Sequence, residues 1–193
     1  VLAGEQPSVG IRSDLVGTGL ALPAPIGKPE TDRARFTAEF LLADDAPINL
    51  FWEGRGNAQL YRQGDAVLGG TVDLTPTDRP QLPPEPAISS GYYLLGALPA
   101  LDVEAWLSSL RDITWPEGLG KTRWDVSIES MQVSEVSLGD TSLGPVRIDL
   151  TPFADWEMLG INADWLDAEF TLRHDATPSA LIINQLNLDL LPE

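Results

Sequence analysis

The stretch WDVSIESMQVSEVSL (residues 124–138) decides the fold class, because apolar and polar residues alternate along it. Alternation with a period of two is typical of a strand that buries one face. The period slips once near Ser130 and again between Val133 and Val136. A slip of this kind is how a β-bulge appears in a sequence. The stretch therefore predicts one long strand with two bulges.

The same alternation recurs along the chain and predicts a mainly antiparallel β fold. The Gly139–Ser142 segment has the composition of a turn between two strands. We also expect a short helical turn at residues 154–159 or 163–166. The further predicted strands cover residues 36–42, 68–74 and 143–150, and a last pair covers 168–172 and 181–190 across His174 to Ser179.

One short amphipathic helix is predicted at about residues 102–111. Asp102 is a favourable N-cap, and Glu104 in the first turn suits the helix dipole. Apolar residues at helical spacing would form one stripe that packs on the sheet. They are Val103, Trp106, Leu107 and Leu110.

Prolines interrupt the strand pattern in two places. LPAPIGKP (residues 22–29) cannot continue a helix or a central strand, so we expect an extended lip that carries Lys28. Thr75 to Ile88 contains five prolines and predicts a long loop. We therefore expect one β-rich segment. Its parts are front strands with the lip (1–75), a proline-rich loop (76–90), a strand plus helix (91–120) and back strands (121–193).

Composition excludes several classes of partner and site. The chain has 12 basic and 29 acidic residues and a formal net charge of −17. Such a chain repels phosphate backbones, so nucleic acid is not expected as a partner, and flat contact with anionic lipid is disfavoured. Cysteine is absent, and no apolar run approaches the roughly 20 residues that span a bilayer. Because the sequence starts at Val1 without a leader, we expect a fragment or a processed product.

Residues that could perform catalysis are few. His174 is the single histidine, no G-x-S-x-G motif exists, and a zinc site lacks ligands. Two groups of carboxylates, at Asp44–Asp45 and at Asp164 to Glu169, could suggest a glycosidase. Their sequence context favours a turn and strand ends instead. We expect no enzymatic activity, no metal and no cofactor.

Several short motifs occur in an order that resembles one protein family. They are SDLVG (13–17), LPAPIGKP (22–29), WEGRG (52–56), GGTV (69–72), GALPALDVEAWL (96–107) and SLGPV (142–146). Together they resemble the YhdP branch of the AsmA-like envelope proteins of Gram-negative bacteria. The helix start within residues 96–107 is the most specific of these matches.

The resemblance implies a curved, groove-like or half-barrel sheet that is apolar inside. It implies a periplasmic conduit for phospholipid between the inner and outer membranes, anchored to the inner membrane in the full-length protein. Phospholipid acyl chains and neighbouring segments of the same full-length chain would be the partners. Membrane contact would occur only through the full-length protein.

The candidate groove residues are the apolar residues in phase along the strands. Lys28 is the candidate for contact with a lipid headgroup. Alternation fits an open groove and one half of a β-sandwich equally well, so a sandwich that binds an envelope polysaccharide or a protein remains an alternative. The groove candidates are Leu68, Val72, Leu74, Trp124, Val126, Ile128, Val146, Ile148, Leu150, Phe170, Leu172, Leu186, Leu188 and Leu190.

Overall fold

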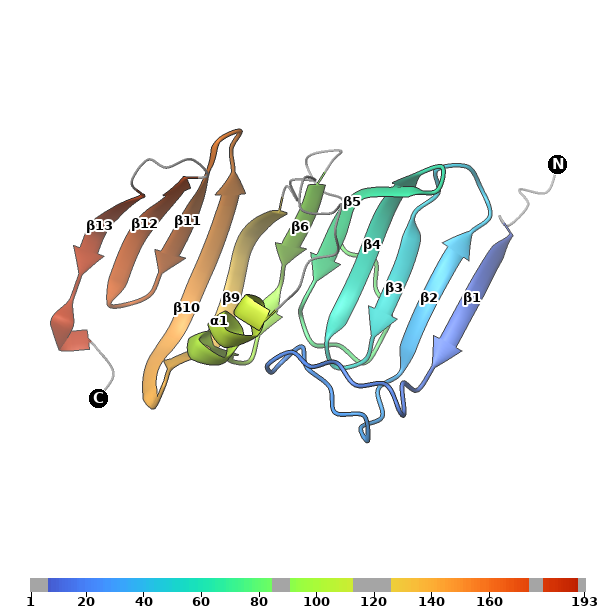
Figure 1. Cartoon of the computed structure of the whole chain (residues 1–193), viewed down its shortest axis with the longest axis horizontal. Helices are drawn as coiled ribbons and strands as arrows, with labels where there is room; N and C mark the ends of the chain where they lie inside the picture. The colour runs from blue at the N-terminus through green and yellow to red at the C-terminus, as the bar shows by residue number, and fades with distance from the viewer. Residues whose placement is uncertain (1–6, 85–90, 113–125, 174–178, 191–193) are drawn as a thin grey trace.

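The computed structural model describes residues 7–84, 91–112, 126–173 and 179–190. Within these residues it contains one sheet and one α-helix (Figure 1). The strands are β1 (Ser8–Ser13), β2 (Phe36–Leu41), β3 (Ile48–Trp52), β4 (Gly56–Gln63), β5 (Ala66–Asp73), β6 (Gly91–Leu95), β7 (Ala97–Leu98), β8 (Leu101–Asp102), β9 (Val126–Leu138), β10 (Thr141–Pro152), β11 (Trp156–Asn162), β12 (Leu166–Arg173) and β13 (Ala180–Leu186). The helices are α1 (Val103–Asp112) and the short 3₁₀ helix η2 (Leu188–Leu190).

The sheet is open, and its strands follow the order of the chain from β1 to β6 and from β9 to β13, while β7 and β8 both pair with β9. Hairpin neighbours pair antiparallel, whereas β5 pairs with β6, and β6 with β9, in parallel. A parallel pair needs a crossover between its strands. Residues 74–84 begin the first crossover. Strands β7 and β8 follow β6 along β9 and pair with it in parallel, and α1 begins the second crossover. The predicted mainly β, groove-like class is confirmed, and the sheet is continuous across the proline-rich loop.

Strand β9 contains the two predicted bulges. Between the pairs Ile128–Leu150 and Met131–Ile148, β9 advances three residues while β10 advances two. Between the pairs Val133–Val146 and Val136–Gly144, β9 again advances three residues while β10 advances two. At the first bulge Ser130 has a φ of 48°, and its backbone N–H donates to Asp149 Oδ1 over 2.7 Å. The sequence prediction of both slips is confirmed.

Helix α1 begins at the predicted cap. The Ala105 N–H donates to Asp102 Oδ1 over 2.9 Å, as an N-cap requires. The predicted apolar stripe is wrong at Leu107, which is 51% exposed, because few side chains cover this short helix. Trp106 instead turns its indole toward the lip, where Nε1 donates to the Ala24 carbonyl over 3.1 Å.

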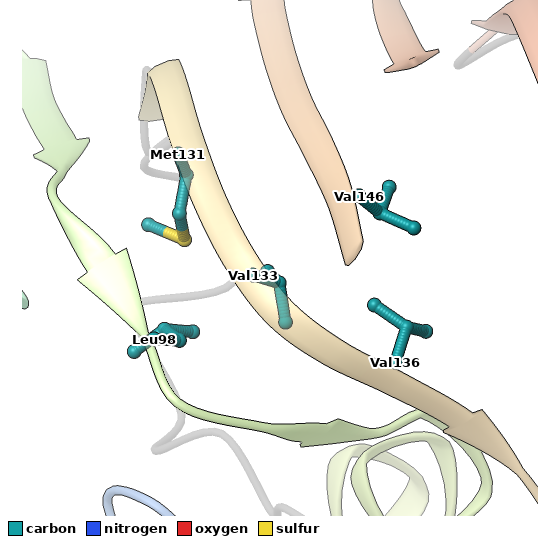
Figure 2. Packing of buried hydrophobic residues seen from close by; sticks show 5 residues of the cluster. All are labelled: Leu98, Met131, Val133, Val136 and Val146. Atoms are coloured by element: carbon teal, nitrogen blue, oxygen red, sulfur yellow. The ribbon is translucent and has the colours of Figure 1, made fainter. Parts of the chain in front are cut away.

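The buried core lies where β7, β8 and the start of α1 meet β9 and β10 (Figure 2). Val133 is its most buried side chain, and Leu101 and Val103 pack against the edge of this cluster. The start of α1 therefore packs over this cluster, whereas β7 and β8 lie beside β9 in the sheet. The cluster consists of Leu98, Met131, Val133, Val136 and Val146.

Two sequence predictions at the C-terminal side are wrong. Neither predicted helical turn, at 154–159 or at 163–166, is present: residues 156–162 form strand β11, because β10 and β12 supply ladder partners on both sides, and residues 163–165 form the tight turn into β12. The last strand ends at Leu186, so Leu188 and Leu190 lie in η2. Asn187 turns the chain here, since its N–H donates to the Trp165 carbonyl and its side chain accepts from the Asp189 N–H.

Candidate functional site

One face of the sheet is apolar across its whole width. Directly paired residues of neighbouring strands point to the same face. The pairing register can be followed from β1 to β13, and every residue met on this path is apolar. The row is Ile11, Ala38, Leu50, Ala58, Val72, Leu94, Ile128, Leu150, Leu159, Phe170 and Leu181. We call the face that carries this row the apolar face.

The opposite face is mainly polar. One step along the strands, Glu39 pairs with Asn49, and Asn49 with Gln59. Gln59 donates to Asn49 Oδ1 and accepts from the Tyr61 hydroxyl, each over 3.0 Å. Burial, with the Glu129 charge second, raises the pKa of Tyr93 on this face, so its phenol stays neutral at physiological pH. We call this the polar face.

Among the residues that the structure describes, no second layer covers much of the apolar face. Leu181, Ile183 and Ile11 near the two edges are 56%, 49% and 51% exposed. Most other side chains of this face are half-buried, because neighbours on the same sheet cover them partly. Within the described residues, the lip and α1 cover parts of this face.

Most predicted groove residues lie on the apolar face. Leu74 directly follows β5 and packs against the core cluster. Leu68 lies beside the β4–β5 bulge and is 46% exposed. Leu188 and Leu190 are wrong as strand residues, because they lie in η2, and Trp124 lies outside the described residues. The predicted groove residues whose strand pairing places them on the apolar face are Val72, Val126, Ile128, Val146, Ile148, Leu150, Phe170, Leu172 and Leu186.

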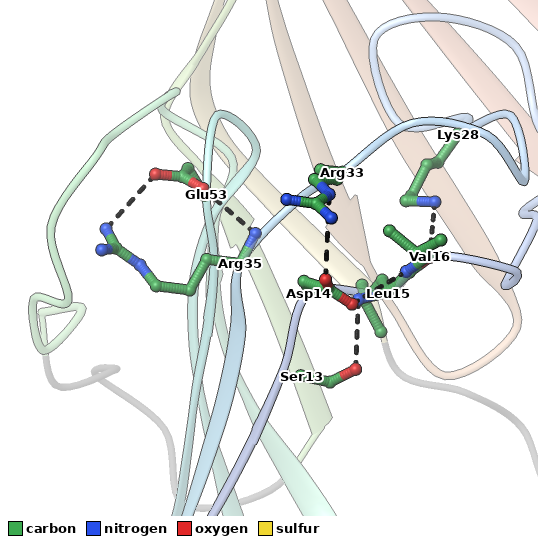
Figure 3. A network of polar contacts seen from close by, with 8 residues as sticks. All are labelled: Ser13, Asp14, Leu15, Val16, Lys28, Arg33, Arg35 and Glu53. Atoms are coloured by element: carbon green, nitrogen blue, oxygen red, sulfur yellow. Dashed lines mark hydrogen bonds and ion pairs between the residues drawn. The ribbon is translucent and has the colours of Figure 1, made fainter.

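Residues 14–35 join β1 to β2 and include the predicted lip at residues 22–29. We call this whole connection the proline lip, and Lys28 stabilises it. This side chain is only 3% exposed. Its Nζ donates to the carbonyls of Leu15 and Thr18 over 2.8 Å and of Pro29 over 2.9 Å. An ammonium has three donors, and all three are used. The prediction that Lys28 meets a lipid headgroup is therefore wrong: it is a buried structural residue (Figure 3).

The ends of the lip are fixed by further polar contacts (Figure 3). Ser13 Oγ accepts from the Leu15 N–H over 3.1 Å. Glu53 accepts from the Arg35 N–H and pairs with the Arg35 guanidinium at 3.4 Å. Within the lip Gly27 is required by space, because a Cβ there would lie 1.8 Å from the Leu22 carbonyl oxygen. The lip is thus a defined structure and not a loose connection.

An apolar cavity of about 230 Å³ lies between the lip and the apolar face. Arg55, in the β3–β4 turn, lines this cavity and donates two hydrogen bonds to the lip. Its Nε donates to the Ile26 carbonyl over 3.0 Å and its Nη2 to the Gly27 carbonyl over 2.6 Å. Its Cζ lies 4.7 Å from the centroid of the Trp52 ring. The apolar lining comes from Ile26, Phe36, Leu50, Trp52, Ala58, Val72 and Leu74.

The carboxylates considered for catalysis do not form a shared site. Asp45 occupies a turn with a φ of 58°, where Oδ1 accepts from the Gly64 N–H. Asp167 and Glu169 lie on β12 in the ladder with β11. Among the described residues, no group of histidine and carboxylate side chains is arranged to hold a metal ion. His174 lies outside those residues.

Comparison of the chain with protein-family models, with curated proteins and with solved structures found no match. In the described part of the chain, no helix has the length and apolar character needed to cross a membrane.

Sequence reasoning alone missed Arg55, Ile26 and Trp52 as parts of one site. Arg55 and Ile26 are 29 residues apart and meet only because the lip folds back onto the β3–β4 turn. The available signal was the long insertion between β1 and β2, two strands that a short turn could join.

Proposed function

We propose that the chain is a non-catalytic segment of a periplasmic hydrophobic conduit that carries phospholipid between the inner and outer membranes. The observation that supports this most is the uninterrupted apolar row from Ile11 to Leu181 on an open sheet. Exposed apolar surface of this extent is rare on monomeric soluble proteins and marks a binding surface. Acyl chains are ligands that match a surface of this kind.

The charge of the molecule suits the same role. A formal net charge of −17 disfavours contact of the molecule with anionic membrane surfaces. Lipid would then meet the protein through its acyl chains on the apolar face. In the full-length protein an inner-membrane anchor and neighbouring segments would extend the conduit.

The alternative of a β-sandwich binding module is not favoured. A sandwich buries its inner face against a second sheet. The described strands belong to one sheet, and the residues at its two edges are exposed. A protein partner that covers the apolar face would be an outcome of the experiment below.

The test is lipid extraction and native mass spectrometry of the chain purified from a Gram-negative envelope. We expect copurified phospholipid. Leu159→Glu places a charge on the apolar face and should reduce bound phospholipid several-fold. Met158→Glu is the matched control, because Met158 pairs with Thr151 and Thr171 on the polar face.

Bound lipid that is equal in the two variants would contradict the proposal. So would a folded, lipid-free chain whose apolar face is closed by a protein.

A further inference from the structure

Arg55 carries a positive charge that forms no ion pair within the described residues. The described ion pairs join Arg33 to Asp14, Arg35 to Glu53 and Arg147 to Asp149. Arg55 joins no carboxylate in the described part of this strongly acidic chain. A half-buried guanidinium without a counter-ion attracts an anion.

The guanidinium is held in place but retains hydrogen-bonding capacity. Arginine has five N–H donors, and the lip carbonyls of Ile26 and Gly27 use two of them. The Trp52 ring supports the guanidinium through a cation–π contact. Three of the five donors have no partner among the described residues.

The apolar cavity lies directly beside this charge, since Arg55 itself is one of its lining residues. Sites for drug-sized ligands measure about 300–1,000 Å³, so 230 Å³ suits part of one alkyl chain rather than a whole phospholipid. Trp52, which also lines the cavity, has a buried Nε1 without an acceptor among the described residues. Asp73 also lines the cavity, but its Oδ1 accepts from the Thr75 N–H at the end of β5.

We propose that the cavity under the lip binds one alkyl chain of an anionic amphiphile whose carboxylate or phosphate contacts Arg55. The chain would lie along Phe36, Leu50 and Val72 beneath Ile26. This inference rests on the proposed function, because an envelope lipid would be the source of the ligand. The site would give the apolar face one position that prefers an anionic head group. The rest of that face would contact acyl chains alone.

The test measures binding of sodium dodecanoate, dodecyl phosphate and 1-dodecanol to the delipidated chain by calorimetry, below the aggregation concentration of each probe. We expect both anions to bind roughly tenfold or more tighter than the alcohol. Arg55→Gln should remove that preference. Arg12→Gln should not, because Arg12 is an exposed arginine of β1 on the polar face.

Two further variants separate the parts of the site. Ala58→Leu fills the cavity and should weaken all three probes. Arg55→Lys keeps the charge and should keep a preference for the anions even if the lip loosens. The inference would be overturned by equal affinities for the alcohol and the anions, or by unchanged anion affinity in Arg55→Gln.

The result is distinguishable from a failure of the conduit proposal. Phospholipid that copurifies with the chain while Arg55→Gln leaves dodecanoate binding unchanged would retain the conduit and reject this site. Arg55-dependent binding of dodecanoate in a chain that copurifies no phospholipid would retain this site and reject the conduit.

Discussion

Lys28 is a buried cation that stabilises the proline lip through backbone carbonyls. Removing an ammonium from water costs several kcal/mol unless hydrogen bonds replace the lost hydration. The carbonyls of Leu15, Thr18 and Pro29 provide that replacement at 2.8–2.9 Å. From the sequence alone, a lysine among prolines and glycines would be placed on the surface. Only closure of the loop between residues 15 and 29 buries it.

Lys28→Met should loosen the lip. Methionine has a similar length but cannot donate, so the carbonyls of Leu15, Thr18 and Pro29 each lose one hydrogen bond, and Thr18 keeps no other donor among the described residues, at a cost of roughly 1–3 kcal/mol. We expect faster proteolytic cleavage within residues 14–35 and a lower free energy of unfolding in urea. Arg33→Met is the control in the same lip, because the Arg33 side chain is 82% exposed and its ion pair with Asp14 spans 3.9 Å. Equal cleavage of the two variants would contradict a structural role for Lys28.

Strand β9 shows which features of an element are readable from sequence. A bulge adds a residue, so it shifts the apolar residues out of phase, and both slips in residues 124–138 were visible. The cap of α1 was visible for a similar local reason, since Asp102 bonds three residues ahead. Parallel pairing of β5, β6 and β9 was not visible, because alternation along a strand does not reveal the direction of its neighbour.

Ser130→Val should destabilise the first bulge of β9. Ser130 has a φ of 48°, a conformation that costs a β-branched residue about 1–3 kcal/mol. Ser130→Gly is the matched variant, because glycine adopts positive φ without this penalty. We expect the valine variant to unfold at a lower urea concentration than the glycine variant. The reverse order would show that this backbone conformation is not required.

At the scale of the whole molecule, the chain is close to a single layer. It exposes 12849 Å², whereas a compact monomer of 20.9 kDa exposes about 9,000 Å². The sequence predicted which residues of a strand share a face, and therefore much of the apolar face. It did not predict the cavity under the lip, because Arg55 and Ile26 come together only through the tertiary fold.

Photo-crosslinking of envelope phospholipid from two adjacent positions would show directly which face carries lipid. Leu150 lies in the apolar row of β10, and Thr151 next to it points to the polar face. With a benzophenone amino acid at either position of the full-length protein, we expect phospholipid adducts from position 150 and few from 151. Equal labelling from both positions, or labelling from 151 alone, would contradict lipid binding on the apolar face.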